Sequence, residues 1–149
     1  VKKVHQLRKK KHDLALLHEE CELNFRRLHR LLPNIKKIGE EIRFSPCDGY
    51  PGSFELRVIK VTRYTSLVRA LSLQRAPHWI ADIDIQIRVY RDAQMAEVVE
   101  WCRDRSIPWA LSEPSGLQAP DEKWQWNMFL SELLAQGIRS ATKSIKASI

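Results

Sequence analysis

The chain has few of the residues that build the commonest catalytic and metal sites. It holds only five glycines and three cysteines among 149 residues. The glycines form neither of the glycine-rich loops that cradle nucleotide phosphates, nor the G-x-S-x-G turn that presents a serine nucleophile. The cysteines are far apart and include no C-x-x-C pair, and the five histidines have no metal-binding spacing. The sequence therefore favours a non-catalytic protein with no cofactor and no metal.

Long apolar runs are also absent. No stretch approaches the roughly 20 apolar residues of a membrane helix, and the first 20 residues lack the apolar core of a signal peptide. Odd, scattered cysteines fit a reducing compartment. We therefore expect a cytoplasmic protein with no membrane partner.

Positive charge is concentrated at one end of the chain. The net charge is +7, and residues 1–12 carry six Lys or Arg and no acid, so residues 13–149 have a net charge of only +1. Blocks of like charge tend to stay disordered. We predict a basic disordered tail (1–12), one domain (13–139) and a frayed C-terminal tail (140–149). The basic tail is either a solvated extension or a nucleic-acid contact made together with Arg26, Arg27 and Arg30.

Two segments have the apolar spacing of helices, with steps of three and four residues. The first should begin with Asp13 as its N-cap and end before Pro33. The second should begin at Asp121 and end near Ser140, with Gly137 awkwardly placed near its end. Their apolar stripes are Leu14, Leu17, Cys21, Phe25, Leu28 and Leu32, then Trp126, Phe129, Leu130, Leu133, Leu134 and Ile138.

The central part of the chain has the patterns of strands. Residues 41–44 form a short candidate strand, and residues 54–74 read as two antiparallel strands around a glycine-free reversal at 62–66. Residues 83–90 alternate strictly between apolar and polar side chains, which indicates a strand with one buried face. Residues 95–101 form a fifth strand or a short helix, and residues 103–120 an irregular loop. We predict an α+β fold, an antiparallel four- to five-stranded meander sheet packed against an N-terminal and a C-terminal helix.

Four sequence blocks are spread over residues 13–138: Cys21–Phe25 with Leu31–Pro33, Thr62–Thr65, Val89–Val98, and Asp121–Lys123 with Gln125, Asn127, Phe129 and Leu130. Together these blocks resemble the YqiB-like family of bacterial cytoplasmic proteins, a domain of unknown function. Two departures from the family pattern are an Arg at position 91, where His is frequent, and the lack of a proline before Asp13. The resemblance implies a bacterial cytoplasmic protein and supplies no activity, catalytic residue or cofactor.

Two predicted reversals should lie at the same end of the sheet and carry the best candidates for a ligand site. Arg63 and Tyr64 lie in one reversal, and Tyr90 and Asp92 in the other, followed by Glu97. An arginine fork and a tyrosine hydroxyl can bind a small anion, which would make these residues an enzyme or sensor site. Alternatively, Arg63 and Asp92 form a structural ion pair between the two turns.

Tryptophan is abundant for this length, with five residues. Aromatic side chains that a small core does not need often anchor partners. We therefore predict a binding or regulatory module that docks another protein through Trp109, Trp124 and Trp126. Cys21 lies on an apolar stripe and is expected to be a small core residue rather than a nucleophile. The sequence predicts no oligomeric state.

Overall fold

The computed structural model describes residues 2–45, 53–73, 83–101 and 119–147, and in these ranges the elements follow the predicted order. A helix is followed by five strands and a second helix, so the α+β fold is confirmed. The elements are α1 (Lys2–Leu31), β1 (Glu41–Phe44), β2 (Phe54–Val61), β3 (Thr65–Ser72), β4 (Asp84–Tyr90), β5 (Met95–Glu100) and α2 (Ala119–Ala147).

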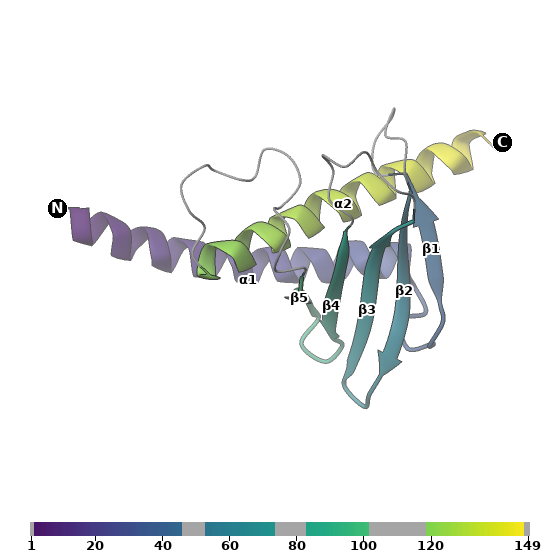
Figure 1. Ribbon diagram of the computed structural model, residues 1–149, viewed down its shortest axis with the longest axis horizontal. Helices are drawn as coiled ribbons and strands as arrows, with labels where there is room; N and C mark the ends of the chain where they lie inside the picture. The colour runs from purple at the N-terminus through teal and green to yellow at the C-terminus, as the bar shows by residue number, and fades with distance from the viewer. Residues whose placement is uncertain (1, 46–52, 74–82, 102–118, 148–149) are drawn as a thin grey trace.

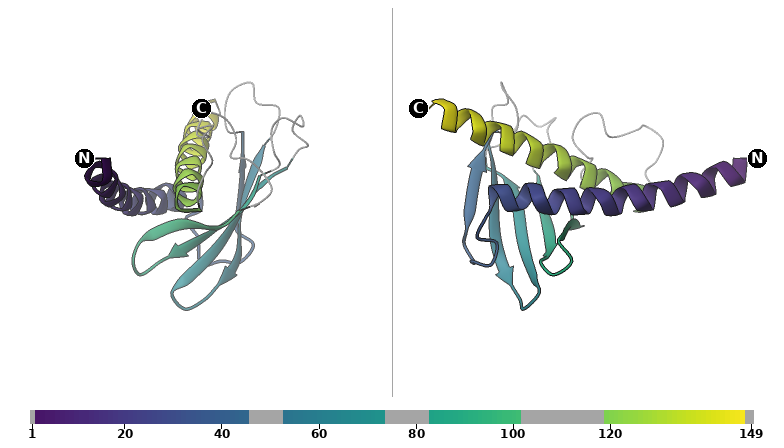
Figure 2. Two further views of the ribbon diagram at one scale, coloured as in Figure 1. Left: turned by 60° about the vertical axis from the view of Figure 1, so that its left-hand side comes forward. Right: turned by 180° about the vertical axis from the view of Figure 1, so that it is seen from behind.

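The five strands form an antiparallel meander in which each strand pairs with the next along the chain. Both helices lie across one face of this sheet (Figures 1 and 2). The alternation predicted for residues 83–90 is confirmed, because Ile85, Ile87 and Val89 are fully buried under the helices. The opposite face carries charged cross-strand pairs, among them Arg69 with Asp84.

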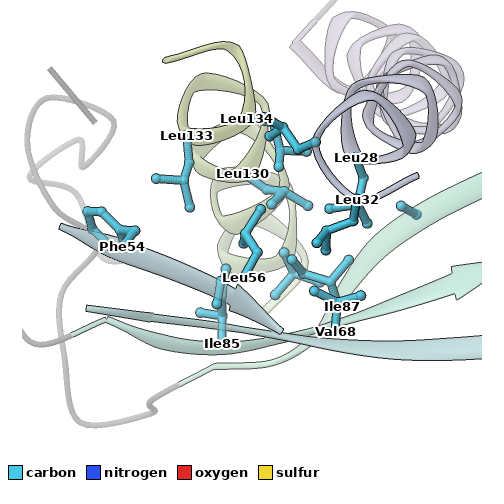
Figure 3. Packing of buried hydrophobic residues seen from close by; sticks show 14 of the residues in the cluster. Leu28, Leu32, Phe54, Leu56, Val68, Ile85, Ile87, Leu130, Leu133 and Leu134 are labelled. Carbon is cyan, nitrogen blue, oxygen red and sulfur yellow. The ribbon is translucent and has the colours of Figure 1, made fainter. Parts of the chain in front are cut away.

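The hydrophobic core fills the layer between the helices and the sheet (Figure 3). Leucines from both helices, such as Leu28 and Leu130, meet Leu56 and Ile87 from the strands, and all four are fully buried. Burying a side chain of this size stabilises the fold by roughly 1.5–3 kcal/mol. The predicted apolar stripes of both helices supply much of this layer.

Both helices are longer than predicted. Helix α1 begins at Lys2, so Asp13 lies inside it and is not an N-cap; lysine, arginine and leucine all favour the helix and extend it toward the N-terminus. Its first half projects beyond the sheet and beyond the start of α2 (Figure 1). Helix α2 begins at Ala119 and continues past Ser140 to Ala147. Among the described residues, no helix is long and apolar enough to cross a membrane. The division of the chain at residues 12 and 139 stays a prediction.

Gly137 has a packing role that explains its place inside α2. A β-carbon at this position would lie 2.9 Å from Cζ of Phe44 and 3.1 Å from Cδ1 of Leu31. Such distances are shorter than normal van der Waals contacts. The glycine thus allows α2 to approach α1 and β1 closely.

Candidate functional site

The two reversals predicted to share one end of the sheet do meet there. The backbone N–H of Arg91, in the β4–β5 turn, donates to the carbonyl of Tyr64, in the β2–β3 turn, at 2.9 Å. The β2–β3 turn needs no glycine, because none of its residues takes a positive φ. Thr62 and Thr65 close it with a backbone hydrogen bond of 2.8 Å, and the Thr62 hydroxyl accepts from the Thr65 N–H. Gln94 takes a left-handed conformation, with φ of 55°, to complete the β4–β5 turn.

The Arg91 guanidinium holds these turns together. Its Nη1 donates to the Thr65 carbonyl at 2.8 Å and to the Ser66 hydroxyl at 2.7 Å. Its Nη2 donates to the carbonyls of Thr62 at 2.6 Å and Arg63 at 2.7 Å. All four acceptors are neutral oxygens. The Arg91 side chain is therefore fixed in place while its positive charge is not neutralised by these contacts.

The same contacts reach the segment between α1 and β1, residues 32–40, which we call the connector. The buried Ser66 hydroxyl donates to the carbonyl of Ile35 at 2.8 Å, which ties the connector to the sheet. A cavity of about 650 Å³ lies between the C-terminal part of α1, this connector and Arg91. Its volume is within the range of small-molecule sites, roughly 300–1,000 Å³. It is lined by Phe25, His29, Pro33, Asn34, Ile35, Lys36, Lys37 and Arg91.

The five predicted ligand residues do not share this cavity. The guanidinium of Arg63 lies over the ring of Tyr64, 5.2 Å from its centroid. The Asp92 carboxylate accepts from the backbone N–H of Ala93 at 2.9 Å. Among the described residues, no ion pair joins Arg63 to Asp92. The two turns come together as expected, but a different arginine, Arg91, faces the cavity.

Tyr90 and Glu97, the other two candidates, form a separate group. The Tyr90 hydroxyl donates to Glu97 Oε1 at 2.8 Å, and Lys123 from α2 pairs with Glu97 Oε2 at 3.2 Å. Partial burial raises the pKa of Tyr90, and the hydrogen bond to Glu97 adds to this effect. Glu97 thus has both oxygens occupied and joins the sheet to α2.

A smaller cavity, of about 300 Å³, involves Tyr90. Strands β2, β3 and β4 line it, and its charged residues are Lys60 and Arg88. Among the described residues that line it, only Tyr90 and Leu67 are aromatic or aliphatic. The larger cavity has a broader wall of this kind and about twice the volume, so it is the better candidate for a ligand site.

A buried polar network links α1, α2 and β5. The fully buried Asn127 accepts from the backbone N–H of Val98 through Oδ1 at 3.0 Å and donates to the carbonyl of Lys123 through Nδ2 at 2.9 Å. The Asn127 carbonyl accepts from Asn24, also fully buried, and from Ser131. The signal for this network was available in the sequence, because Asn24 and Asn127 are polar residues within the helical apolar stripes.

Glu20 extends the network to a charged pair on α1. Its Oε2 lies 2.8 Å from the Ser131 hydroxyl, which shares its one proton between this carboxylate and the Asn127 carbonyl. The same Oε2 pairs with Arg27 at 3.2 Å, and Arg27 also donates to Asn24. Arg27 is therefore engaged between the helices. Of the three arginines predicted to extend a nucleic-acid contact, Arg26 and Arg30 are exposed on α1.

The tryptophans predicted to bind a partner differ in their surroundings. Trp126 is 1% exposed and lies in the core, where its ring meets Phe129 edge-on. Trp124 is half-buried, and Trp109 lies outside the described residues. The two that are described thus supply little exposed aromatic surface, and a protein partner stays a prediction.

Cys21 lies in the core at 3% exposure, as expected. Burial raises the pKa of its thiol from 9.0 to about 11, with a smaller contribution from the charge of Glu97. Such a thiol is a poor nucleophile at neutral pH. In the part of the chain that the structure describes, no group of three His, Cys, Asp or Glu side chains could hold a metal ion.

Comparisons with known proteins point to one family. A family model described as "Protein of unknown function (DUF1249)" matches residues 27–143, which include all five strands and most of α2. Proteins named "Uncharacterized protein YqiB" from Escherichia coli strains K12, O6:H1 and O157:H7 are each 31% identical over 115 residues. These matches cover 76% of this chain and 80% of each relative. No solved structure matches the chain.

Proposed function

We propose that the protein is a non-catalytic binding module for a small anionic ligand. The chain belongs to the YqiB-like family described as DUF1249, whose function is unknown, so the support for the proposal comes from its own geometry. The ligand would occupy the cavity between α1, the connector and Arg91, which we call the basic cavity. This proposal keeps the class of ligand expected from the sequence and moves it to other residues.

The observation that carries the proposal is the charge of the cavity wall. Four lining residues are basic, and the lining includes no acid. Lys36 and Lys37 are exposed, and neither pairs with a carboxylate among the described residues. The folded domain is nearly neutral overall, so this concentration of one sign is local. The basic residues are His29, Lys36, Lys37 and Arg91.

Arg91 supplies the fixed part of this charge. Its four acceptors are neutral oxygens, and they take up the four N–H groups of Nη1 and Nη2. The side chain is therefore already ordered before an anion binds, and its positive charge attracts the anion through space or through the N–H of Nε. The C-terminal end of α1, close by, opposes an anion with roughly half a negative charge. Two lysines and one arginine exceed this effect, so the potential in the cavity is positive.

Calorimetric titration with inorganic pyrophosphate at low ionic strength tests the proposal. We expect saturable binding of one ion, which weakens about tenfold or more in the Lys36→Gln/Lys37→Gln variant because each exposed cation contributes on the order of 1 kcal/mol. The matched control is Lys60→Gln/Arg139→Gln, which removes the same charge elsewhere, including from the smaller cavity. Absence of binding, or an equal loss in the control, would show that the basic cavity is not the site.

The other predictions from sequence remain open to test. Docking of a protein partner and contact with nucleic acid through residues 1–12 both stay predictions. A cytoplasmic location stays one as well, and fractionation of the bacterial host cells would test it.

A further inference from the structure

The basic cavity has a second wall of different chemistry. Phe25 and His29 line it from α1, with ring centroids 6.2 Å apart and planes inclined by 32°. Pro33 and Ile35 continue this wall along the connector. Phe25 is half-buried against the core and is therefore held in place, while His29 is exposed. A flat ring can stack on such a wall, and a bare phosphate would leave it unused.

From this pairing of walls we infer that the ligand is a nucleotide unit, with its base against Phe25 and His29 and its phosphate between Lys36, Lys37 and Arg91. The inference rests on the proposed function and specifies its ligand. No glycine-rich loop is needed, because side-chain cations take the part that backbone N–H groups play in a phosphate cradle. A volume of about 650 Å³ leaves room for a base, a sugar and phosphate together.

A nucleotide unit can be free or part of a single strand, and α1 gives a reason to test both. Arg26 and Arg30 are exposed on α1 beside His29 in the sequence. The helix continues from there to Lys2 and carries the six basic residues of the segment 1–12. A helix of 30 residues is about 45 Å long. Successive phosphates of a strand could follow this helix, whereas a free nucleotide would need only the cavity.

The test compares three ligands by titration against the full chain: pyrophosphate, adenosine diphosphate and a single-stranded RNA of about eight nucleotides. We expect adenosine diphosphate or the RNA to bind about tenfold more tightly than pyrophosphate, the factor expected from one stacked base. The Phe25→Leu variant should lose this margin and keep its affinity for pyrophosphate. The control Tyr64→Leu removes an exposed aromatic outside the cavity and should keep the margin.

His29→Ala provides a second test that does not touch the core, should Phe25→Leu unfold the chain. If the RNA binds more tightly than the diphosphate and its affinity falls steeply with salt, the source is a strand; comparable affinities identify a free nucleotide. The inference is overturned if the base gives no gain over pyrophosphate, or if the gain survives both cavity variants. Failure of the unaltered chain to bind pyrophosphate would instead refute the proposed function.

Discussion

Replacing Asn127 by alanine tests whether the polar network between the helices and β5 stabilises the fold. The side chain is fully buried and makes two hydrogen bonds of its own, at 3.0 and 2.9 Å. Alanine would leave the N–H of Val98 without this partner. An unsatisfied buried donor costs about 1–3 kcal/mol, and alanine returns roughly 0.6 kcal/mol as the better helix former. We expect a net loss of about 1.5 kcal/mol in the free energy of unfolding.

Urea unfolding followed by tryptophan fluorescence measures this loss as a lower midpoint at unchanged slope. The matched control is Gln136→Ala, which removes a partly exposed amide on the same helix whose Oε1 accepts an exposed hydrogen bond from Arg139. We expect the control to change stability by less than about 0.5 kcal/mol. If Asn127→Ala were equally mild, the network would be a consequence of the packing and not a source of stability.

Asn127→Asp adds a pH dependence whose sign follows from the geometry. The carboxylate still accepts from Val98 but cannot donate to the Lys123 carbonyl, and its charge is buried. Burial raises the pKa of such a carboxyl above its unfolded value of about 3.9, so the folded state binds the proton more tightly. This variant should therefore be least stable at neutral pH and recover toward about pH 4, relative to Asn127→Ala at each pH. A flat difference between the two variants would contradict the burial of this side chain.

Two further predictions concern buried positions on the helices. In a Cys47→Ser/Cys102→Ser background, the Cys21 thiol, with its pKa raised to about 11, should react with a thiol reagent far more slowly in the native state than in urea. The unfolded thiol ionises at a lower pH than the folded one, so the free energy of unfolding should fall as pH rises from about 9 to about 11. Equal reaction rates would show that Cys21 is accessible. Gly137→Val should destabilise the fold by about 2 kcal/mol or more, because its branched side chain would overlap Phe44 and Leu31, and a thermal melt with an unchanged midpoint would contradict this packing.

Much of the fold could be predicted because it depends on local periodicity. The steps of three and four residues around Leu28 and Leu130 give the buried stripes of the helices, and the alternation from Ile83 to Val89 gives the buried face of β4. The predicted start of α1 at Asp13 was wrong. Asp13 can act as an N-cap only if the residues before it are not helical, and here they continue the helix. Helix ends are decided by such local competition, and core faces by many residues together.

The candidate site was harder to predict because it depends on side-chain pairing across the chain. Sequence order correctly placed the two turns at one end of the sheet. It could not show that Arg91, and not Arg63, binds the carbonyls of the other turn, since both arginines lie in turns with similar neighbours. The sequence also could not show that Lys36 and Lys37 lie beside Arg91. The hydrogen bond that fixes the connector joins Ser66 to Ile35, which are 31 residues apart.

The contact between Asn127 and Val98 also affects how the protein behaves at high concentration. Strand β5 ends the sheet, and unpaired N–H groups on a terminal strand invite pairing with other molecules, which leads to aggregation. The N–H of Val98 is already occupied by α2, so an incoming strand would have to displace the helix. At the other edge of the sheet, β1 has only four residues and carries Glu41 and Arg43, whose charges disfavour edge-to-edge pairing with another sheet. The two edge strands are thus protected by different means: a helix covers β5, and β1 is short and charged.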